Sequence, residues 1–137
     1  MNPPANPTAQ IEPGLSATET TVVTREITVA HFHPEMPEVY GTPFMIYLME
    51  VAASLAIQPL LPPGWVSVGA EVNVRHLAAT PVGHTVTASA RVTAVADRLV
   101  HFAVEAHDGD ELVGSGTHVR AVVDLAKFER RIDNKRK

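Results

Sequence analysis

The sequence contains no cysteine, which excludes disulfide bonds, thiol catalysis and cysteine metal sites. It has neither a basic, apolar leader at its start nor an apolar run of the about 18 residues that indicate a membrane span. At 137 residues the chain has the length of one domain, which is enough to bury a core without metal or disulfide cross-links. We therefore expect a soluble, cytoplasmic protein with no membrane partner.

Motifs for several common ligands are also missing. There is no glycine-rich phosphate loop, and no stripe of aromatic and basic residues of the kind that binds nucleic acid. The seven histidines show no H-E-x-x-H or comparable spacing. We therefore predict no metal site and no nucleic-acid partner.

Charge is unevenly distributed over the chain, whose formal net charge is −4. Residues 127–137 hold six Lys and Arg against two acidic residues, a net +4 that leaves −8 on the rest. A basic segment of this kind either keeps a chain end solvated or attracts a polyanion such as the phosphates of a coenzyme.

The part of the chain poorest in charge is residues 42–70, where Glu50 is the only charged residue. Thr42 followed by Pro43 reads as an N-cap with proline at the first helical position. Apolar residues then recur at three- and four-residue spacing, which predicts a long enclosed helix. A carboxylate inside such a helix needs a partner or a proton, because burying it alone is costly.

Thr42 and Glu50 share one side of this helix. Eight residues separate them, which corresponds to about 12 Å of rise and about 80° of rotation. A substrate lying along the helix would meet both. The alternatives are that Thr42 is only a cap and that Glu50 is only a charge tolerated at a groove or a dimer interface.

The sequence before this helix is rich first in proline and then in β-branched residues. Residues 1–19 have little to bury, which indicates a flexible N-terminal arm. Residues 20–32 carry β-branched side chains of one parity, which predicts a first strand. The segment HPEMPEVYG then leads onto the helix, so we interpret residues 31–40 as a candidate lid, with His33 and Met36 shaping the pocket beneath it.

After Pro-Pro-Gly at residues 62–64 the hydrophobic period changes from helical to two. In WVSVGAEVNVRH, one face is predicted to hold the valines and Ala70, and His76 falls in register with them. If this strand packs on the helix, His76 faces Glu50 or Thr42. The alternative is a core histidine whose hydrogen bonds are satisfied.

Three more stretches of period two follow, over residues 85–96, 100–107 and 112–124, and DGDE marks a hairpin before the last. The order is strand, long helix and four antiparallel strands, with one face of the sheet on the helix. This is an α+β class: a hot-dog fold, with one long central helix wrapped by a five-stranded antiparallel sheet.

The predicted hot-dog domain covers residues 20–131, between the arm of residues 1–19 and a basic tail of residues 132–137. A single copy leaves one side of the helix and an edge strand uncovered. We therefore expect a two-fold homodimer joined edge to edge, and leave open a dimer of dimers.

Three segments of the chain resemble one group of enzymes. EVYGTPFMIYLME, VGAEVNVRHLAATPVGHTVT and EAHDGDELVGSGTHVRAVVDLAKF together are similar to the fluoroacetyl-CoA thioesterases of the hot-dog superfamily. The resemblance covers nearly the whole predicted domain. It implies that Thr42, Glu50 and His76 are catalytic, and that the Gly69 backbone and the Arg120 side chain contact an acyl-CoA substrate.

The implied reaction is hydrolysis of an acyl-CoA to the free acid and CoA. We expect a short acyl group, with fluoroacetyl-CoA among the candidates, because the bulky Met45, Tyr47 and Met49 and the nearby lid leave little room for a long chain. Such a reaction needs a base or nucleophile, a proton carrier and donors for the oxyanion. Glu50 would be the base or nucleophile and His76 the proton carrier, while Thr42 would orient substrate or water or be acylated itself. Backbone N–H groups at the helix start would stabilise the oxyanion. No cofactor is expected, since CoA is part of the substrate.

Two other functions remain open on the sequence alone. A hot-dog hydratase or dehydratase would act on an enoyl-CoA and leave the thioester intact. A non-catalytic module would bind an acyl-CoA without turnover. Release of free thiol separates hydrolysis from both.

Overall fold

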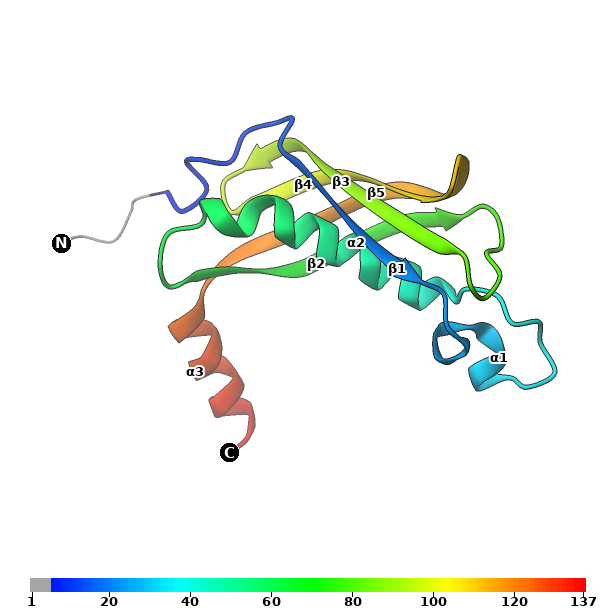
Figure 1. Cartoon of the computed structure of the whole chain (residues 1–137). Coiled ribbons are helices and arrows are strands. Elements are labelled where there is room, and N and C mark those ends of the chain that lie inside the picture. Colours follow the sequence, from blue (N-terminus) through cyan, green and yellow to red (C-terminus); the bar gives the residue numbers. More distant parts are fainter. Residues whose placement is uncertain (1–5) are drawn as a thin grey trace.

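The computed structural model describes residues 6–137, which form one curled antiparallel sheet around a helix (Figure 1). The strands are β1 (Ser16–Val22), β2 (Trp65–His76), β3 (Thr85–Ala96), β4 (Leu99–Asp108) and β5 (Glu111–Asp124). Their order in the sheet is β1-β3-β4-β5-β2, so β1 and β2 are the two edges. The predicted α+β class with five antiparallel strands is confirmed.

The central helix α2 (Thr42–Ile57) lies within the curl of this sheet (Figure 1), and a 3-10 turn, Gln58–Leu60, extends it. Small side chains line the contact, because alanines on the helix meet alanines on the strands and let the two backbones approach. These buried alanines are Ala52, Ala53 and Ala56 on α2, and Ala88, Ala90 and Ala106 on β3 and β4. The core is therefore closed mainly by helix against sheet.

The segment Thr42–Leu60 is the one stretch of the described chain that is long and apolar enough to cross a membrane, with a mean hydropathy of 1.4. Our expectation that no segment reaches this length is wrong by this measure. The segment is nevertheless the helix around which the sheet curls, and it holds Glu50 against a buried arginine. Packing thus accounts for its apolar character.

The flexible arm predicted for residues 1–19 is wrong for the part that the structure describes. β1 already begins at Ser16 and pairs with β3. Ahead of it, Ile11 belongs to the buried core, and the Thr8 hydroxyl donates to the Asp97 carbonyl at 2.7 Å. The prolines dominate the composition here, but one isoleucine and one threonine supply the packing. Residues 1–5 lie outside the described part.

The first strand predicted in residues 20–32 ends early, at Val22. The chain then forms two short helices, η1 (Arg25–Ile27) and α1 (Val29–Phe32). Thr28 lies between them, fully buried, and its hydroxyl donates to the Arg25 carbonyl at 2.7 Å. This local side-chain contact replaces the strand pairing that the β-branched residues suggested.

β2 contains a β-bulge that the sequence did not predict. Gly69 pairs with Arg120 and Glu71 pairs with Val119, which leaves Ala70 as the extra residue. A bulge of this kind reverses the face on which all later residues of the strand lie.

The bulge explains why the predicted inner face of β2 is wrong for residues before it. Trp65 and Val74 are an odd number of residues apart, yet both pack on the core. Val66 and Val68 therefore share a face neither with Val74 nor with His76. The prediction that His76 faces the helix holds, because it lies beyond the bulge.

The basic tail predicted for residues 132–137 is largely helical. It forms the end of α3 (Leu125–Lys135), which projects away from the sheet (Figure 1). Asp124 caps this helix by accepting from the Lys127 N–H at 3.2 Å. The predicted boundary at residue 131 thus falls inside α3.

Candidate active site

The first group of site residues joins the start of α2 to the end of β2. The Thr42 hydroxyl lies 2.7 Å from Nδ1 of His76, the last residue of β2. The sequence predicted that His76 faces either Glu50 or Thr42, and in the structure it contacts Thr42.

Thr42 is not the N-cap that the sequence predicted. Gly41 occupies that position with an extended backbone, and Thr42 and Pro43 are the first residues of the helix. A side chain at Gly41 would come within 3.0 Å of the Phe44 ring, which favours glycine there. The Thr42 hydroxyl caps nothing and is therefore available to His76.

His76 has the properties of a base near neutral pH. Burial lowers the pKa of His76, opposed by a contact with the Ala78 backbone, so the ring is neutral at pH 7. In the tautomer that lets Nδ1 accept from Thr42, the ring proton is on Nε2. Nε2 is buried and has no hydrogen-bond partner within residues 6–137. A neutral ring in this position is able to take the Thr42 proton.

The second group lies further along α2 and surrounds a buried guanidinium. We call Glu50, Ser67, His118 and Arg120 the Arg120 cluster. Arg120 donates from Nε to the Ser67 hydroxyl at 2.8 Å and from Nη2 to the Ser67 carbonyl at 3.1 Å. Its Nη1 lies 3.2 Å from His118 Nε2 and 3.5 Å from Glu50 Oε2. Burial lowers the pKa of Arg120, and the Glu50 charge opposes that effect.

Glu50 is thus neither isolated nor fully enclosed. Its side chain is 35% exposed, while that of Arg120 is 8% exposed. The partner that the sequence required for this carboxylate is Arg120, which the resemblance had assigned to the substrate. Glu50 therefore presents a charged oxygen to solvent from a fixed position.

His118 is the residue of this site that sequence reasoning missed. It is 2% exposed, its Nδ1 lies 2.8 Å from the Glu71 carbonyl, and its ring stacks on Phe102. Burial lowers the pKa of His118, and the nearby Arg120 charge lowers it further. A signal was present, because His118 and Arg120 have the same parity as Gly114 on β5, which faces α2.

Gly69 has a steric role beside Glu50. A Cβ at this position would lie 2.6 Å from Glu50 Oε2 and 3.5 Å from the His118 ring. Only glycine lets the carboxylate approach the backbone of β2 this closely. The predicted contact of the Gly69 backbone with substrate stays a prediction, but its place beside Glu50 is observed.

The two groups are separate within one chain. Thr42 and Glu50 are about 12 Å apart along α2, and no hydrogen bond or ion pair links the groups in residues 6–137. Of the two helix residues that the sequence offered as neighbours of His76, Thr42 contacts it in the single chain and Glu50 does not.

Few backbone donors are free at the start of α2. Pro43 has no N–H, and the N–H groups of Phe44 and Met45 both point to the Gly41 carbonyl, at 3.0 and 3.2 Å. Within the described residues this leaves the Thr42 N–H as the candidate oxyanion donor in the first turn. The sequence predicted that free backbone N–H groups at the helix start would act as oxyanion donors, and the structure leaves one such group in the first turn.

Thr42 lies on the rim of two small cavities. One, of about 320 Å³, is shared with His76, and the other, of about 230 Å³, lies under α1. Both have a volume suited to a small group rather than a long acyl chain. Thr42 is common to the two walls.

The candidate lid of residues 31–40 forms part of these walls. His33 lines the cavity under α1, whereas Met36 is 47% exposed and lines neither cavity. Tyr40 holds the end of the lid, because its hydroxyl donates to the Phe44 carbonyl at 3.0 Å. Burial raises the pKa of Tyr40 to about 12, so this donor keeps its proton.

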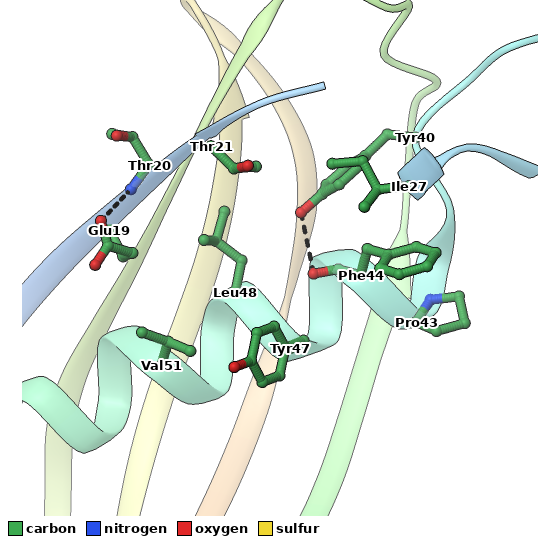
Figure 2. Close-up of a pocket in the computed structure, with 10 residues that line it drawn as sticks. All are labelled: Glu19, Thr20, Thr21, Ile27, Tyr40, Pro43, Phe44, Tyr47, Leu48 and Val51. Atoms are coloured by element: carbon green, nitrogen blue, oxygen red, sulfur yellow. Dashed lines mark hydrogen bonds between the residues drawn. The ribbon is translucent and has the colours of Figure 1, made fainter. Parts of the chain in front are cut away.

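A larger groove of about 700 Å³ runs between β1 and α2 (Figure 2). Its lining is mostly apolar and includes Phe44, Tyr47 and Val51 from the helix. Neither Glu50 nor His76 lines this groove, although Pro43 and Phe44 line both the groove and the cavity under α1.

Residues 23–126 match the sequence profile of the fluoroacetyl-CoA-specific thioesterases. The chain belongs to this family. The fluoroacetyl-CoA thioesterase of Streptantibioticus cattleyicolor is 44% identical in an alignment of 128 residues that covers 89% of this chain and 92% of that protein. The family predicted from the sequence is confirmed, and with it the assignment as a thioester hydrolase.

Solved structures of fluoroacetyl-CoA thioesterases share the fold. A crystal structure of a variant enzyme with fluoroacetate and CoA is 44% identical to this chain, with a TM-score of 0.79 over 86% of this chain and 99% of that one. A thioesterase superfamily member from Thermus thermophilus is 34% identical, with a TM-score of 0.83 over 91% and 95%. The hot-dog architecture is therefore common to the family over nearly its whole length.

Proposed function

We propose that this enzyme hydrolyses short acyl-CoA thioesters, and that Thr42 and His76 are its reacting pair. The observation that carries the proposal is the 2.7 Å contact between the Thr42 hydroxyl and His76 Nδ1 at the rim of two small cavities. A hydroxyl held by a neutral imidazole is a typical activated nucleophile.

The proposed reaction has two halves. Thr42 Oγ1 attacks the thioester carbonyl while His76 Nδ1 takes its proton, and that proton then passes to the CoA sulfur as the C–S bond breaks. Water next attacks the acyl-threonine ester while His76 takes its proton. The bond between the acyl carbon and Thr42 Oγ1 then breaks, the proton passes from His76 to Oγ1, and the free acid is released. The Thr42 N–H and the start of the α2 dipole stabilise the oxyanion in both halves.

The Arg120 cluster supplies the second contact region for the substrate. An acyl-CoA is an extended molecule, so one that lies along α2 reaches from Thr42 to the charged oxygen of Glu50. Glu50 and Arg120 carry opposite charges at this point, and Gly69 leaves room beside them. We propose that these residues orient the substrate, with Glu50 also available as a base for water.

The acyl group is proposed to be short. The cavities beside Thr42, of about 320 and 230 Å³, are at or below the lower end of typical ligand pockets. A relative with 44% identity is named for fluoroacetyl-CoA. Acetyl-, fluoroacetyl- and propionyl-CoA are therefore the substrates to compare.

A two-fold homodimer joined along β2 is the proposed assembly. β2 has twelve residues and no proline, and within the described chain only β5 pairs with it. Such an unprotected edge readily pairs with another strand. Because Gly69 and His76 both lie on β2, a second copy would cover the site. The exposed Tyr47 on α2, 67% exposed, would suit a further contact between two dimers.

We also propose that the enzyme acts in the cytoplasm and without a metal or other cofactor. Within residues 6–137, no group of three His, Asp or Glu side chains is placed to bind a metal ion. Hydrolysis that persists at an unchanged rate in EDTA would support this. Sedimentation over a range of concentrations tests the dimer.

The test of the proposed function is hydrolysis of an acyl-CoA panel, followed by release of free thiol. The chain has no cysteine to react with the colorimetric reagent. We expect turnover of one or more short esters that Thr42→Ala and Glu50→Gln each reduce strongly. Loss of enoyl absorbance without thiol release would instead identify a hydratase. A melting shift with neither signal would identify a binding module.

A further inference from the structure

We propose that His118 is a positioning residue that fixes the Arg120 guanidinium beside Glu50, an inference that rests on the proposed function for its kinetic consequence. None of the residues that the resemblance assigned to the site lies between Arg120 and the backbone of β2. His118 fills that place.

The contacts of His118 lock its ring in one orientation. Nδ1 lies 2.8 Å from the carbonyl of Glu71, which only accepts hydrogen bonds, so Nδ1 carries the ring proton. Nε2 is then an acceptor, and it lies 3.2 Å from Arg120 Nη1, which only donates. The ring of Phe102, with its centroid 6.0 Å away, lies against one face. Each nitrogen therefore has the one partner that this tautomer permits.

The electrostatics of the site favour the same tautomer. A protonated His118 would place a second positive charge next to Arg120 inside the fold. Burial and the Arg120 charge lower the pKa of His118, while the contact with the Glu71 carbonyl and the Glu50 charge oppose them. The pKa is lowered overall, which keeps the ring neutral at pH 7 and Nε2 free to accept.

Arg120 is consequently held on two sides. The Ser67 hydroxyl accepts from Nε, and the Ser67 carbonyl accepts from one N–H of Nη2. On the other side, His118 Nε2 accepts from Nη1. Nη1 also faces Glu50 Oε2 at 3.5 Å. Within the described residues these contacts leave one N–H on Nη2 to meet a substrate. Without His118, the half of the guanidinium that faces Glu50 would lose its fixed partner.

Two variants separate this role from simple packing. His118→Gln keeps an acceptor near the place of Nε2, whereas His118→Asn keeps a donor near Nδ1 and loses that acceptor. Both variants lose the imidazole ring that lies against Phe102. We expect KM for the best short acyl-CoA to rise about tenfold in His118→Asn and less than threefold in His118→Gln, since one hydrogen bond to a charged group is lost. We expect kcat to change less than KM, because Thr42 and His76 are untouched.

The matched control is His107→Asn on β4, where the histidine is partly exposed and lies 3.9 Å from Glu105. This variant is expected to leave both kinetic constants unchanged. Equal losses in His118→Gln and His118→Asn would overturn the proposal, because they would show that the ring acts by packing alone.

A double-mutant cycle tests whether His118 acts through Arg120. Arg120→Gln removes the guanidinium, and in that background His118→Asn is expected to change kcat/KM by less than twofold. Effects that multiply would show that His118 contributes independently of Arg120, and would overturn the proposal.

Nitrogen-15 NMR of the histidine rings and of the arginine Nε–H tests the geometry without any activity. We expect a single His118 tautomer, protonated on Nδ1, at pH 7. The Arg120 Nε–H should exchange slowly in the unmutated enzyme and in His118→Gln, and faster in His118→Asn. A doubly protonated ring, or a proton on Nε2, would refute the positioning role. If every acyl-CoA ester fails as a substrate, the proposed function falls and this measurement still decides the role of His118.

Discussion

The two groups of the active site are built in opposite ways, although both connect α2 to the same half of the sheet. The Thr42–His76 pair is a single hydrogen bond near the surface, and His76 Nε2 has no partner in residues 6–137. In the Arg120 cluster, by contrast, the side chain of Arg120, a residue that is 7% exposed, is held by three hydrogen bonds and by an ion pair with Glu50.

This difference shows which group is suited to react and which to hold a position. An unsatisfied buried nitrogen is costly, and a catalytic role is one explanation for such a group. A charge that is held by several contacts resists displacement, because each of these contacts would have to break. Removing a residue of the Thr42–His76 pair should therefore affect activity with little effect on stability, whereas removing Arg120 should also lower stability.

The largest expected effect is on catalysis, from His76→Ala. Removal of a general base typically reduces the rate by about 10²–10⁴-fold, whereas one exposed hydrogen bond is lost from the fold. We expect kcat to fall by that factor while the urea midpoint changes little. His84→Ala, which removes an exposed histidine paired with Asp108 at 2.9 Å, is the control for kcat. A large fall in stability with His76→Ala would contradict the distinction between the Thr42–His76 pair and the Arg120 cluster.

The next largest effect is on stability, from Arg120→Met. The variant keeps much of the side-chain volume but leaves His118 and Ser67 without their partner. Breaking a buried charged network in this way costs about 3 kcal/mol of unfolding free energy, measurable by urea denaturation. Arg98→Met, which removes a guanidinium over the Trp65 ring at 4.8 Å, should cost about 1 kcal/mol or less. Equal costs for the two variants would contradict the distinction.

A smaller effect is expected from Gly69→Ala. The new methyl group would lie 2.6 Å from Glu50 Oε2, so the carboxylate must turn away from β2 and from Arg120. We expect kcat/KM to fall about tenfold, as for other displaced charged contacts, with a small change in melting temperature. Ala70→Ser, at the neighbouring bulge position, is the control. Unchanged kinetics would show that the position of Glu50 is not critical.

The smallest effect is the dependence of stability on pH. The pKa values of His76 and His118 are both lowered from 6.5 by burial, so the unfolded chain binds more protons than the folded one in mildly acidic solution. Their contribution to stability is complete above about pH 6.5 and is lost as the pH falls toward the folded-state values. The melting temperature should fall as the pH is lowered from 7.5 to 5.5, and the melting temperature of His118→Gln should fall less steeply. A flat profile would argue that both rings are already accessible to protons.

Much of this architecture follows from the sequence because its signals are local. The helical spacing behind Pro43 and the alternation in β3 and β4 each depend on neighbours within a few residues. The orientation of His76 toward the helix was also predictable, from its register in the strand, although the sequence left open whether it meets Glu50 or Thr42. The isolated charge at Glu50 correctly indicated that a partner exists.

The errors arose where contacts between distant residues decide the structure. Thr8 and Ile11 are ordered by the far end of β3 and the core, which composition cannot reveal. Thr28 turns the chain into a short helix through one side-chain hydrogen bond. His118 was passed over because its partners, Arg120 and the Glu71 carbonyl, come together only when β2 and β5 pair.

The extra residue at Ala70 has a consequence for how this strand tolerates changes in length. Gly69 and His76 are seven positions apart, which in a regular strand would put them on opposite faces, yet both face α2. A one-residue insertion or deletion at any other position between Gly69 and His76 would still allow a ladder with β5, but it would turn either the glycine or the histidine outward. Half of the active site would then be on the wrong surface of an otherwise intact sheet. In this enzyme the two functional residues thus depend on how far apart they lie along the strand, and also on whether the number of positions between them puts both on the same face.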